Sequence, residues 1–241
     1  MIKITETEVF GFRAAFRDMR NPKESWHLSD SRFGLDYAQD VHMDPDHPVR
    51  ASHLMLHQLG FYVPEWPVIG PEDMKLATSL ISGGTEHRKF LRQIVINAVF
   101  EAPRYLWQEI DTYKVATVRD SCSTMHKLGH RDLVPTDFEA SDISPSLLDQ
   151  LNGLGRQYRG GDKKDFSLVV RMKRLLPEGY LQRAGYHMSY ETALSMFRQR
   201  ANHRLAEWRF TTGTQVVDRS ICDWIYLLPC MSNFIGAMKS S

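Results

Sequence analysis

Alternating and helical patterns of apolar positions predict the main elements of the chain. Residues 3–12, KITETEVFGF, and residues 94–103, IVINAVFEAP, alternate as strands do. Apolar residues at helical spacing predict longer helices over residues 70–84, 144–158, 165–176 and 189–210. The last of these patterns is the longest, and Arg198, Arg200 and Arg204 occupy its polar face.

Shorter segments between these elements are assigned from their composition. Residues 85–93 and 103–110 are expected to be short helical pieces, and residues 177–188 a loop or a short strand. The sequence contains no internal repeat and no convincing linker, so we expect a single domain over residues 1–241.

Charge and cysteine usage exclude several classes of protein. The net charge of +1 gives no surface-wide field for nucleic acid, so direct binding to DNA or RNA is not expected. The cysteines, Cys122, Cys222 and Cys230, are odd in number and irregularly spaced. This argues against a disulfide framework and favours a reducing, cytoplasmic location.

No membrane segment is expected either. The first residues lack the apolar core of a signal peptide, and no uninterrupted apolar run reaches 18 residues. The C-terminal stretch ICDWIYLLPCMSNFIGAM is apolar, but Asp223 and Pro229 interrupt it. We expect this stretch to be a buried helix and tail, or a contact between subunits.

Residues 111–126 form a dense run of side chains that titrate or exchange hydrogen bonds. A core element would repeat apolar positions, and a plain linker would contain more glycine and proline. The run therefore indicates a site. An extended or irregular backbone suits it better than a helix, because alternate side chains then point to opposite sides and can serve two ligands.

Metal binding is a weaker interpretation of two segments. Cys122, His126 and His130 are four residues apart and would share one face of a helix, as zinc ligands can. They supply only three ligands, so mixed packing and solvent roles explain them better. Residues 40–48, DVHMDPDHP, contain oxygen and imidazole ligands, but a solvated turn is the plainer explanation. We expect no metal site.

Phosphate binding is a second interpretation of the basic residues. Arg200 and Arg204 would lie one turn apart on the predicted helix, and Lys173 and Arg174 precede the LLPEGY segment. Arginine holds oxyanions through two parallel hydrogen bonds, so these residues could bind a phosphate. Salt bridges on a solvated face are the alternative.

The polar run, read with its flanking segments, resembles the flavin-dependent thymidylate synthases. That family has a Gly-His pair, a strand ending in Ala-Pro, a Gln, the motif R-H-R-x-x-S-x-N-x-x-S-x-R-Y, and later a Leu-Pro pair, a Thr-Arg pair and a helix ending in Leu-Arg. Over roughly residues 80–210 the residues that agree in frame and identity are His87, Pro103, Gln108, Asp120, Pro177, Arg183 and Arg200. The R-H-R triplet falls on Thr112, Tyr113 and Lys114, a replacement similar to that in divergent phage members.

The resemblance implies an α+β fold, with a central, mainly antiparallel sheet flanked by helices, usually assembled as a homotetramer. It implies FAD as cofactor and methylenetetrahydrofolate and NADPH as co-substrates, in a bacterial or phage-infected cell. A pyrimidine deoxynucleotide such as dUMP would accept the one-carbon unit. Because the flavin carries the hydride chemistry, the protein needs only to hold the ligands in position and polarise them. A sequence without a recognisable catalytic triad fits this role.

The resemblance also assigns side chains to the two ligands. Those expected at the flavin or its phosphates are His87, Thr112, Tyr113, Lys114 and Arg183. Those expected at the nucleotide are Asp120, Cys122, Ser123, Thr124, Lys173 and Arg200. Asp120 and Cys122 are expected to be catalytic.

For Cys122, the resemblance places a thiol where the family has a serine. A thiolate at this position, favoured by nearby Lys114 or Arg119, could add to C6 of the pyrimidine. A buried, inert thiol is the alternative.

Two departures from the family pattern leave the reaction open. Thr124 stands at the position of the arginine that the family has near the nucleotide phosphate. Ser189 stands at the position of the asparagine that the family has before its last helix. A different pyrimidine, a hydroxymethyl instead of a methyl product, or lost activity would each explain them. The competing hypothesis is a catalytically silent homologue that binds a nucleotide or a protein partner.

Overall fold

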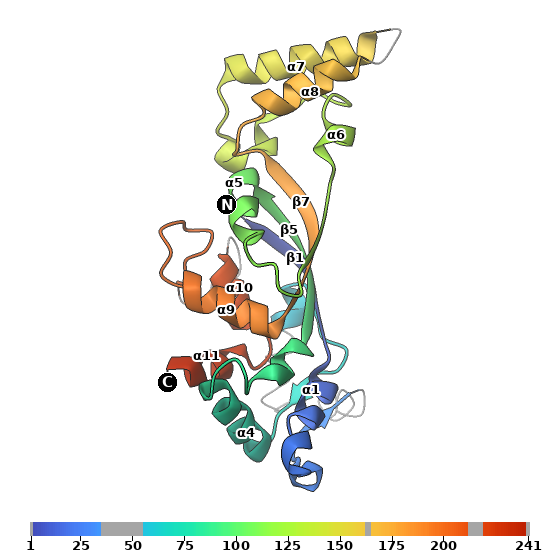
Figure 1. Cartoon of the computed structure of the whole chain (residues 1–241). Coiled ribbons are helices and arrows are strands. Elements are labelled where there is room, and N and C mark those ends of the chain that lie inside the picture. Colours follow the sequence, from blue (N-terminus) through green and yellow to red (C-terminus); the bar gives the residue numbers. More distant parts are fainter. Residues whose placement is uncertain (1, 35–54, 162–164, 212–218, 240–241) are drawn as a thin grey trace. The chain divides into compact units, whose positions relative to one another are not determined.

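The computed structural model describes residues 2–34, 55–161, 165–211 and 219–239 (Figure 1). A five-stranded sheet has the order β3-β1-β5-β7-β6, and a second sheet pairs β2 with β4. The strands are β1 (Lys3–Phe10), β2 (Arg32–Phe33), β3 (Phe61–Tyr62), β4 (Pro67–Val68), β5 (Val95–Pro103), β6 (Val118–Ser121) and β7 (Leu181–Ser189). β1 and β3 run parallel, so the main sheet is not purely antiparallel.

Helices flank this sheet, which confirms the α+β class. The α-helices in the described part of the chain are α1 (Phe12–Asp18), α4 (Pro71–Ser82), α5 (Arg104–Ile110), α6 (Thr124–Lys127), α7 (Pro145–Gly160), α8 (Phe166–Leu175), α9 (Tyr190–Arg200), α10 (Ile221–Leu227) and α11 (Met231–Lys239). Single 3-10 turns, of which Lys89–Arg92 is one, join several of them.

The contacts divide the chain into two compact units. The first consists of Met1–Lys3, Phe100–Thr112 and Arg119–Gly185, and the second of Ile4–Val99, Tyr113–Val118 and Tyr186–Ser241. The chain passes between them within β1, β5 and β7 and on both sides of the segment Tyr113–Val118. One domain over residues 1–241 stays a prediction.

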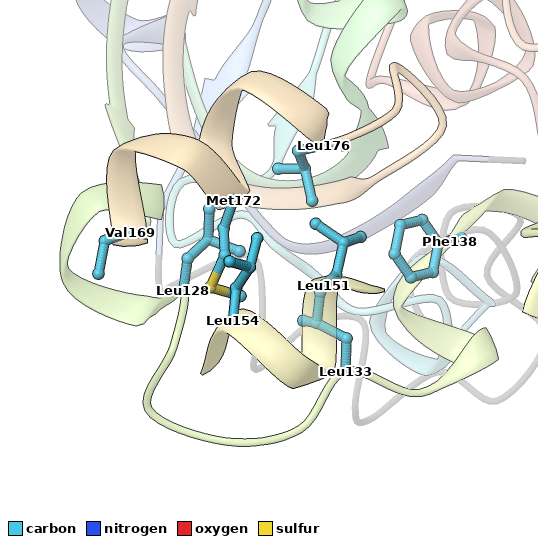
Figure 2. Packing of buried hydrophobic residues seen from close by; sticks show 8 residues of the cluster. All are labelled: Leu128, Leu133, Phe138, Leu151, Leu154, Val169, Met172 and Leu176. Carbon is cyan, nitrogen blue, oxygen red and sulfur yellow. The ribbon is translucent and has the colours of Figure 1, made fainter. Parts of the chain in front are cut away.

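The first unit has a hydrophobic core between α7 and α8 (Figure 2). The cluster consists of Leu128, Leu133, Phe138, Leu151, Leu154, Val169, Met172 and Leu176. The two helices pack along one another, and each has a side-chain cap: Ser144 Oγ accepts from Leu147 N, and Asp165 Oδ1 from Ser167 N. The helical patterns over 144–158 and 165–176 thus form the scaffold of this unit.

The second unit is built on aromatic contacts around α1, α9 and α11. Tyr190 is fully buried, and its ring meets Phe12 edge-on with centroids 5.4 Å apart. Phe90 and Phe234 cross at 90°. The turn into α1 requires a glycine, because Gly11 has φ of 96° and a Cβ there would lie 2.2 Å from Gln93 O.

The apolar C-terminal stretch forms α10 and α11 inside the second unit. Trp224 and Phe234 are fully buried, and Trp224 Nε1 donates to Thr7 Oγ1 at 3.0 Å. The stretch is therefore buried within its own chain. In the described part no single helix has both the length and the hydropathy of a membrane span, although α10 and Met231–Met238, bent by 109°, pass that test as a pair.

Three predicted elements differ from the structure. The helix expected over 189–210 ends at Arg200, so the longest described helix is α7. Residues 85–93 form only the 3-10 turn Lys89–Arg92. Residues 177–188 contain most of a nine-residue strand, β7, because the sheet supplies pairing on both its sides that the local sequence does not show.

Candidate functional site

In the first unit, the residues of β6 and those directly after it are held against β7. Cys122 N donates to Arg183 O at 2.9 Å, and Gln182 Nε2 donates to Cys122 O at 2.8 Å. Two residues earlier, Asp120 O lies 3.9 Å from where a Cβ on Gly185 would be. These pairings place β6 antiparallel to β7.

Asp120 and Cys122 lie on an open face of this strand pair. Alternate residues of an extended chain point the same way, and both residues are exposed. Arg119, which precedes Asp120, lies against α5: its guanidinium is 4.9 Å from the centre of the Trp107 ring, and its Nη1 is 3.0 Å from Asp111 Oδ2. A carboxylate and a thiol are thus presented together.

Cys122 differs from the other two cysteines. Burial raises the pKa of the Cys222 and Cys230 thiols to about 12, so both are unreactive at neutral pH. The burial considered for the Cys122 thiol is wrong, because this residue is exposed. Arg119, expected to favour the Cys122 thiolate, is instead paired with Asp111.

Other expected nucleotide residues lie on neighbouring helices of the first unit. Ser123 Oγ accepts from His126 N at 3.4 Å and starts α6, of which Thr124 is the first residue. α6 contacts α8, on which Lys173 is exposed. Arg183 is exposed on β7 beside Cys122. The first unit therefore brings the thiol, a hydroxyl-bearing turn and basic side chains onto adjoining elements.

The backbone of the polar run is mostly extended or irregular, as expected. β6 covers Val118–Ser121, and helix begins only at Thr124. Thr112 follows α5, and its Oγ1 donates to Glu109 O at 2.7 Å. The proton of this hydroxyl is therefore engaged by the last turn of α5. Gln108 Nε2 donates to Glu178 Oε2 at 3.1 Å.

The zinc interpretation does not fit the structure. α6 ends at Lys127 and Gly129 has φ of 87°, so Cys122, His126 and His130 do not share a helical face. Where side chains are described, no three or more His, Cys, Asp or Glu residues gather as a metal site would require. Residues 40–48 lie outside the described part.

In the second unit, Arg200 and Tyr113 contact each other directly. Arg200 Nε donates to Tyr113 Oη at 3.1 Å, and Tyr113 Oη donates to Gln199 Oε1 at 3.1 Å. The guanidinium also lies 5.3 Å from the centre of the buried Trp208 ring. Tyr113, which is expected at the flavin, and Arg200, which is expected at the nucleotide, thus contact each other.

The second unit does not place Arg204 with Arg200 on one helix. α9 ends at Arg200, where His203 Nε2 lies 2.9 Å from Arg200 Nη1 and Phe210 N donates back to Ala201 O at 2.9 Å. The expectation that Arg200 and Arg204 lie one turn apart on one helix is therefore wrong, and that arrangement cannot form the phosphate site considered for them. Just past the last turn Leu205 N lies 3.3 Å from His203 Nδ1, a contact that the spacing of apolar residues did not reveal.

Lys114 lies in an exposed turn that the second unit holds firmly. Thr117 Oγ1 donates to Tyr113 O at 2.6 Å, and Thr192 Oγ1 donates to Val115 O at 3.0 Å. Lys114 is exposed, and Val115 is 76% exposed. A cation and an apolar side chain thus project from a fixed backbone.

His87 follows α4 in the second unit. Its backbone N donates to Gly84 O at 3.1 Å, and its ring would lie 3.1 Å from a Cβ on Gly83. The side chain is exposed. Among residues that the sequence did not single out, His187 Nδ1 and Asn97 Oδ1 are 2.8 Å apart on β7 and β5 of the same unit.

The expected site residues therefore fall into two groups. The first unit contains Thr112, Asp120, Cys122, Ser123, Thr124, Lys173 and Arg183. The second unit contains His87, Tyr113, Lys114 and Arg200. The polar run itself crosses from one unit to the other and back.

The fold defines a class of proteins: the chain shares the α+β fold of flavin-dependent thymidylate synthases. A structure of ThyX from Helicobacter pylori complexed with FAD and dUMP matches with a TM-score of 0.54 and 12% identity, over 84% of this chain and 86% of that one. A second H. pylori ThyX structure with FAD and dUMP matches with a TM-score of 0.59 and 12% identity, over 99% and 100%. No protein-family model and no curated protein sequence matches the chain.

Proposed function

We propose that the chain transfers a one-carbon unit from methylenetetrahydrofolate to a pyrimidine deoxynucleotide, dUMP or a close variant, using FAD and NADPH. The observation that carries this proposal is the full-length likeness to an enzyme crystallised with FAD and dUMP. Shared fold alone does not imply shared activity. The proposal therefore also rests on the exposed side chains at the positions that the resemblance assigns.

The exposed donors suit an anionic cofactor and substrate. His87, Lys114 and Arg183 are all exposed, and cationic or N–H groups are what a pyrophosphate or phosphate requires. Bound FAD would supply the hydride chemistry, and these side chains would bind and orient it. In this proposal Lys114 and Tyr113 hold the cofactor, and Tyr113 also contacts Arg200.

At the nucleotide, the proposal assigns Asp120 and Cys122 to the pyrimidine. Hydrogen bonds to β7 hold the backbone at Cys122, so Asp120 and Cys122 project from one face of a fixed strand. The Cys122 thiolate would add to C6, and Asp120 would bind the polar edge of the base. Ser123 Oγ and Thr124 would lie toward the sugar or phosphate, with Lys173 and Arg200 as cations.

We expect the purified protein to be yellow, to bind added FAD and to be a homo-oligomer, by proposal a tetramer. Val115 and Val118 are 76% and 63% exposed in the second unit, and a subunit contact would remove such side chains from water. Absorbance in the flavin bands, FAD titration and light scattering measure these properties. A colourless monomer that takes up no FAD would contradict the proposal and favour the silent homologue.

Separate substitutions should distinguish the two ligands of the polar run. Lys114→Ala should mainly reduce FAD retention, because it removes a cation from the Tyr113–Val118 turn. Asp120→Ala should mainly reduce dUMP affinity, because it removes an acceptor from β6. Losing a hydrogen bond to a charged group costs about 1.5–3 kcal/mol, at least about tenfold in affinity.

Calorimetric titration of both ligands into both variants measures this separation. Lys127→Ala and Asp149→Ala are matched controls, since both residues are exposed in the first unit outside the assigned set. If all four variants bind both ligands as the wild type does, the polar run is structural and the assignment of these residues is wrong.

A further inference from the structure

The guanidinium of Arg200 is held from several sides within the second unit. Its carbon lies 5.9 Å from the centre of the Tyr113 ring and 5.3 Å from that of Trp208, and the two rings are 6.0 Å apart. Nε donates to Tyr113 Oη, and Nη1 lies 2.9 Å from His203 Nε2. Two aromatic faces and two hydrogen bonds therefore fix both the plane and the rotation of this group.

The chemistry of the Arg200–His203 contact determines the state of the imidazole. Arginine remains protonated in proteins and only donates, so His203 Nε2 must accept. Leu205 N is also placed as a donor to the other nitrogen, Nδ1, at 3.3 Å, but a neutral imidazole has only one unprotonated nitrogen and can accept only one of the two hydrogen bonds. The charged contact is shorter and stronger, so we place the ring proton on Nδ1.

We propose that His203 is a positioning residue that sets the direction of the Arg200 guanidinium for an anionic ligand. This inference rests on the proposed function, in which Arg200 binds the nucleotide. A guanidinium has five N–H groups in a fixed fork, so fixing one side of the fork determines where the remaining donors point. His203 thus contributes to the affinity for a phosphate without touching it.

A purely structural role would act through a different atom. If His203 only ended α9, the important contact would be that of Nδ1 with Leu205 N. Asparagine can place a polar atom near the position of Nδ1, and glutamine near that of Nε2. The two substitutions therefore separate the structural role from the positioning role.

The first test measures dUMP affinity by calorimetry in FAD-loaded wild type, His203→Gln, His203→Asn and His203→Leu. If His203 positions Arg200, the dUMP affinity of His203→Gln should stay within about threefold of the wild-type value. The dUMP affinity of His203→Asn and of His203→Leu should fall about tenfold, the usual effect of losing one charge-assisted hydrogen bond. FAD retention should be unchanged in all of them. Rescue by asparagine and not by glutamine would overturn the inference.

The second test needs no nucleotide, so it separates failure of this inference from failure of the proposed function. Nitrogen–proton NMR spectra report on the Arg200 Nε–H group, which Arg200→Lys assigns. We expect a slowly exchanging Arg200 signal in the wild type and in His203→Gln, and a broadened one in His203→Asn and His203→Leu. An unchanged signal in every variant would refute positioning; wild-type protein that keeps this pattern but fails to bind dUMP would refute only the proposed function.

Discussion

Asp73→Asn is expected to lower the free energy of unfolding by about 3–5 kcal/mol, because it leaves a buried arginine without its counterion. Asp73 is fully buried at the start of α4, and Arg20 is 4% exposed. Their Oδ1 and Nε atoms are 2.6 Å apart, and Asp73 Oδ2 also accepts from Ser29 Oγ and Ser31 N. Urea unfolding at neutral pH measures the loss.

The control for this prediction is Asp149→Asn, which changes an exposed carboxylate on α7. Surface carboxylates without a close partner contribute little, so its unfolding curve should overlay that of the wild type. A loss below about 1 kcal/mol in Asp73→Asn would show that the ion pair does not hold α4 to the preceding segment.

The same carboxylate gives stability a defined pH dependence. Burial opposes ionisation of Asp73, but hydrogen bonds from Ser31, Ser29 and Arg20 outweigh it, so its pKa lies below the ordinary value. The stabilisation is therefore complete above the unfolded pKa of about 3.9 and is lost as the pH falls through the lower folded value. The difference in stability between wild type and Asp73→Asn should shrink with acid in that range.

Leu151→Ala is expected to destabilise the helical part of the first unit by about 2–5 kcal/mol. Leu151 is fully buried in the cluster of α7 and α8 (Figure 2). The lost methyl groups leave a cavity among side chains such as Leu133 and Phe138. Since α8 carries Lys173, loosening this core should also weaken nucleotide binding.

Hydrogen exchange measures this effect where it arises. Amides of α7 and α8 should exchange faster in Leu151→Ala, while those of α4 in the second unit should not change. Val134→Ala is the control, because the Val134 side chain is 45% exposed and its truncation leaves no cavity. Equal protection in Leu151→Ala and the wild type would mean that the cluster does not stabilise the two helices.

Local patterns were sufficient for elements whose buried positions alternate or repeat within one segment. The alternation of residues 94–103 predicted β5, and its residues Ile96, Ala98 and Phe100 are buried in turn. In the site, the density of polar residues located the β6 segment and its exposed Asp120 and Cys122. Periodicity failed at the end of α9, because the apolar spacing continues through Leu205 and Trp208 although the helix ends at Arg200 and the chain turns back, with Phe210 N donating to Ala201 O.

The sequence by itself predicted most of the helices and strands and singled out the polar run as the candidate site, whereas the α+β class was implied by the family resemblance. These features follow from apolar periodicity and from residue type, which act over a few neighbouring positions. Only the tertiary structure decided that Tyr113 and Arg200 bind each other, that Arg119 is paired with Asp111, and that Asp73 is buried against Arg20. The Tyr113–Arg200 and Arg20–Asp73 contacts join residues 87 and 53 positions apart, and the sequence encodes such partners only through the fold that brings them together.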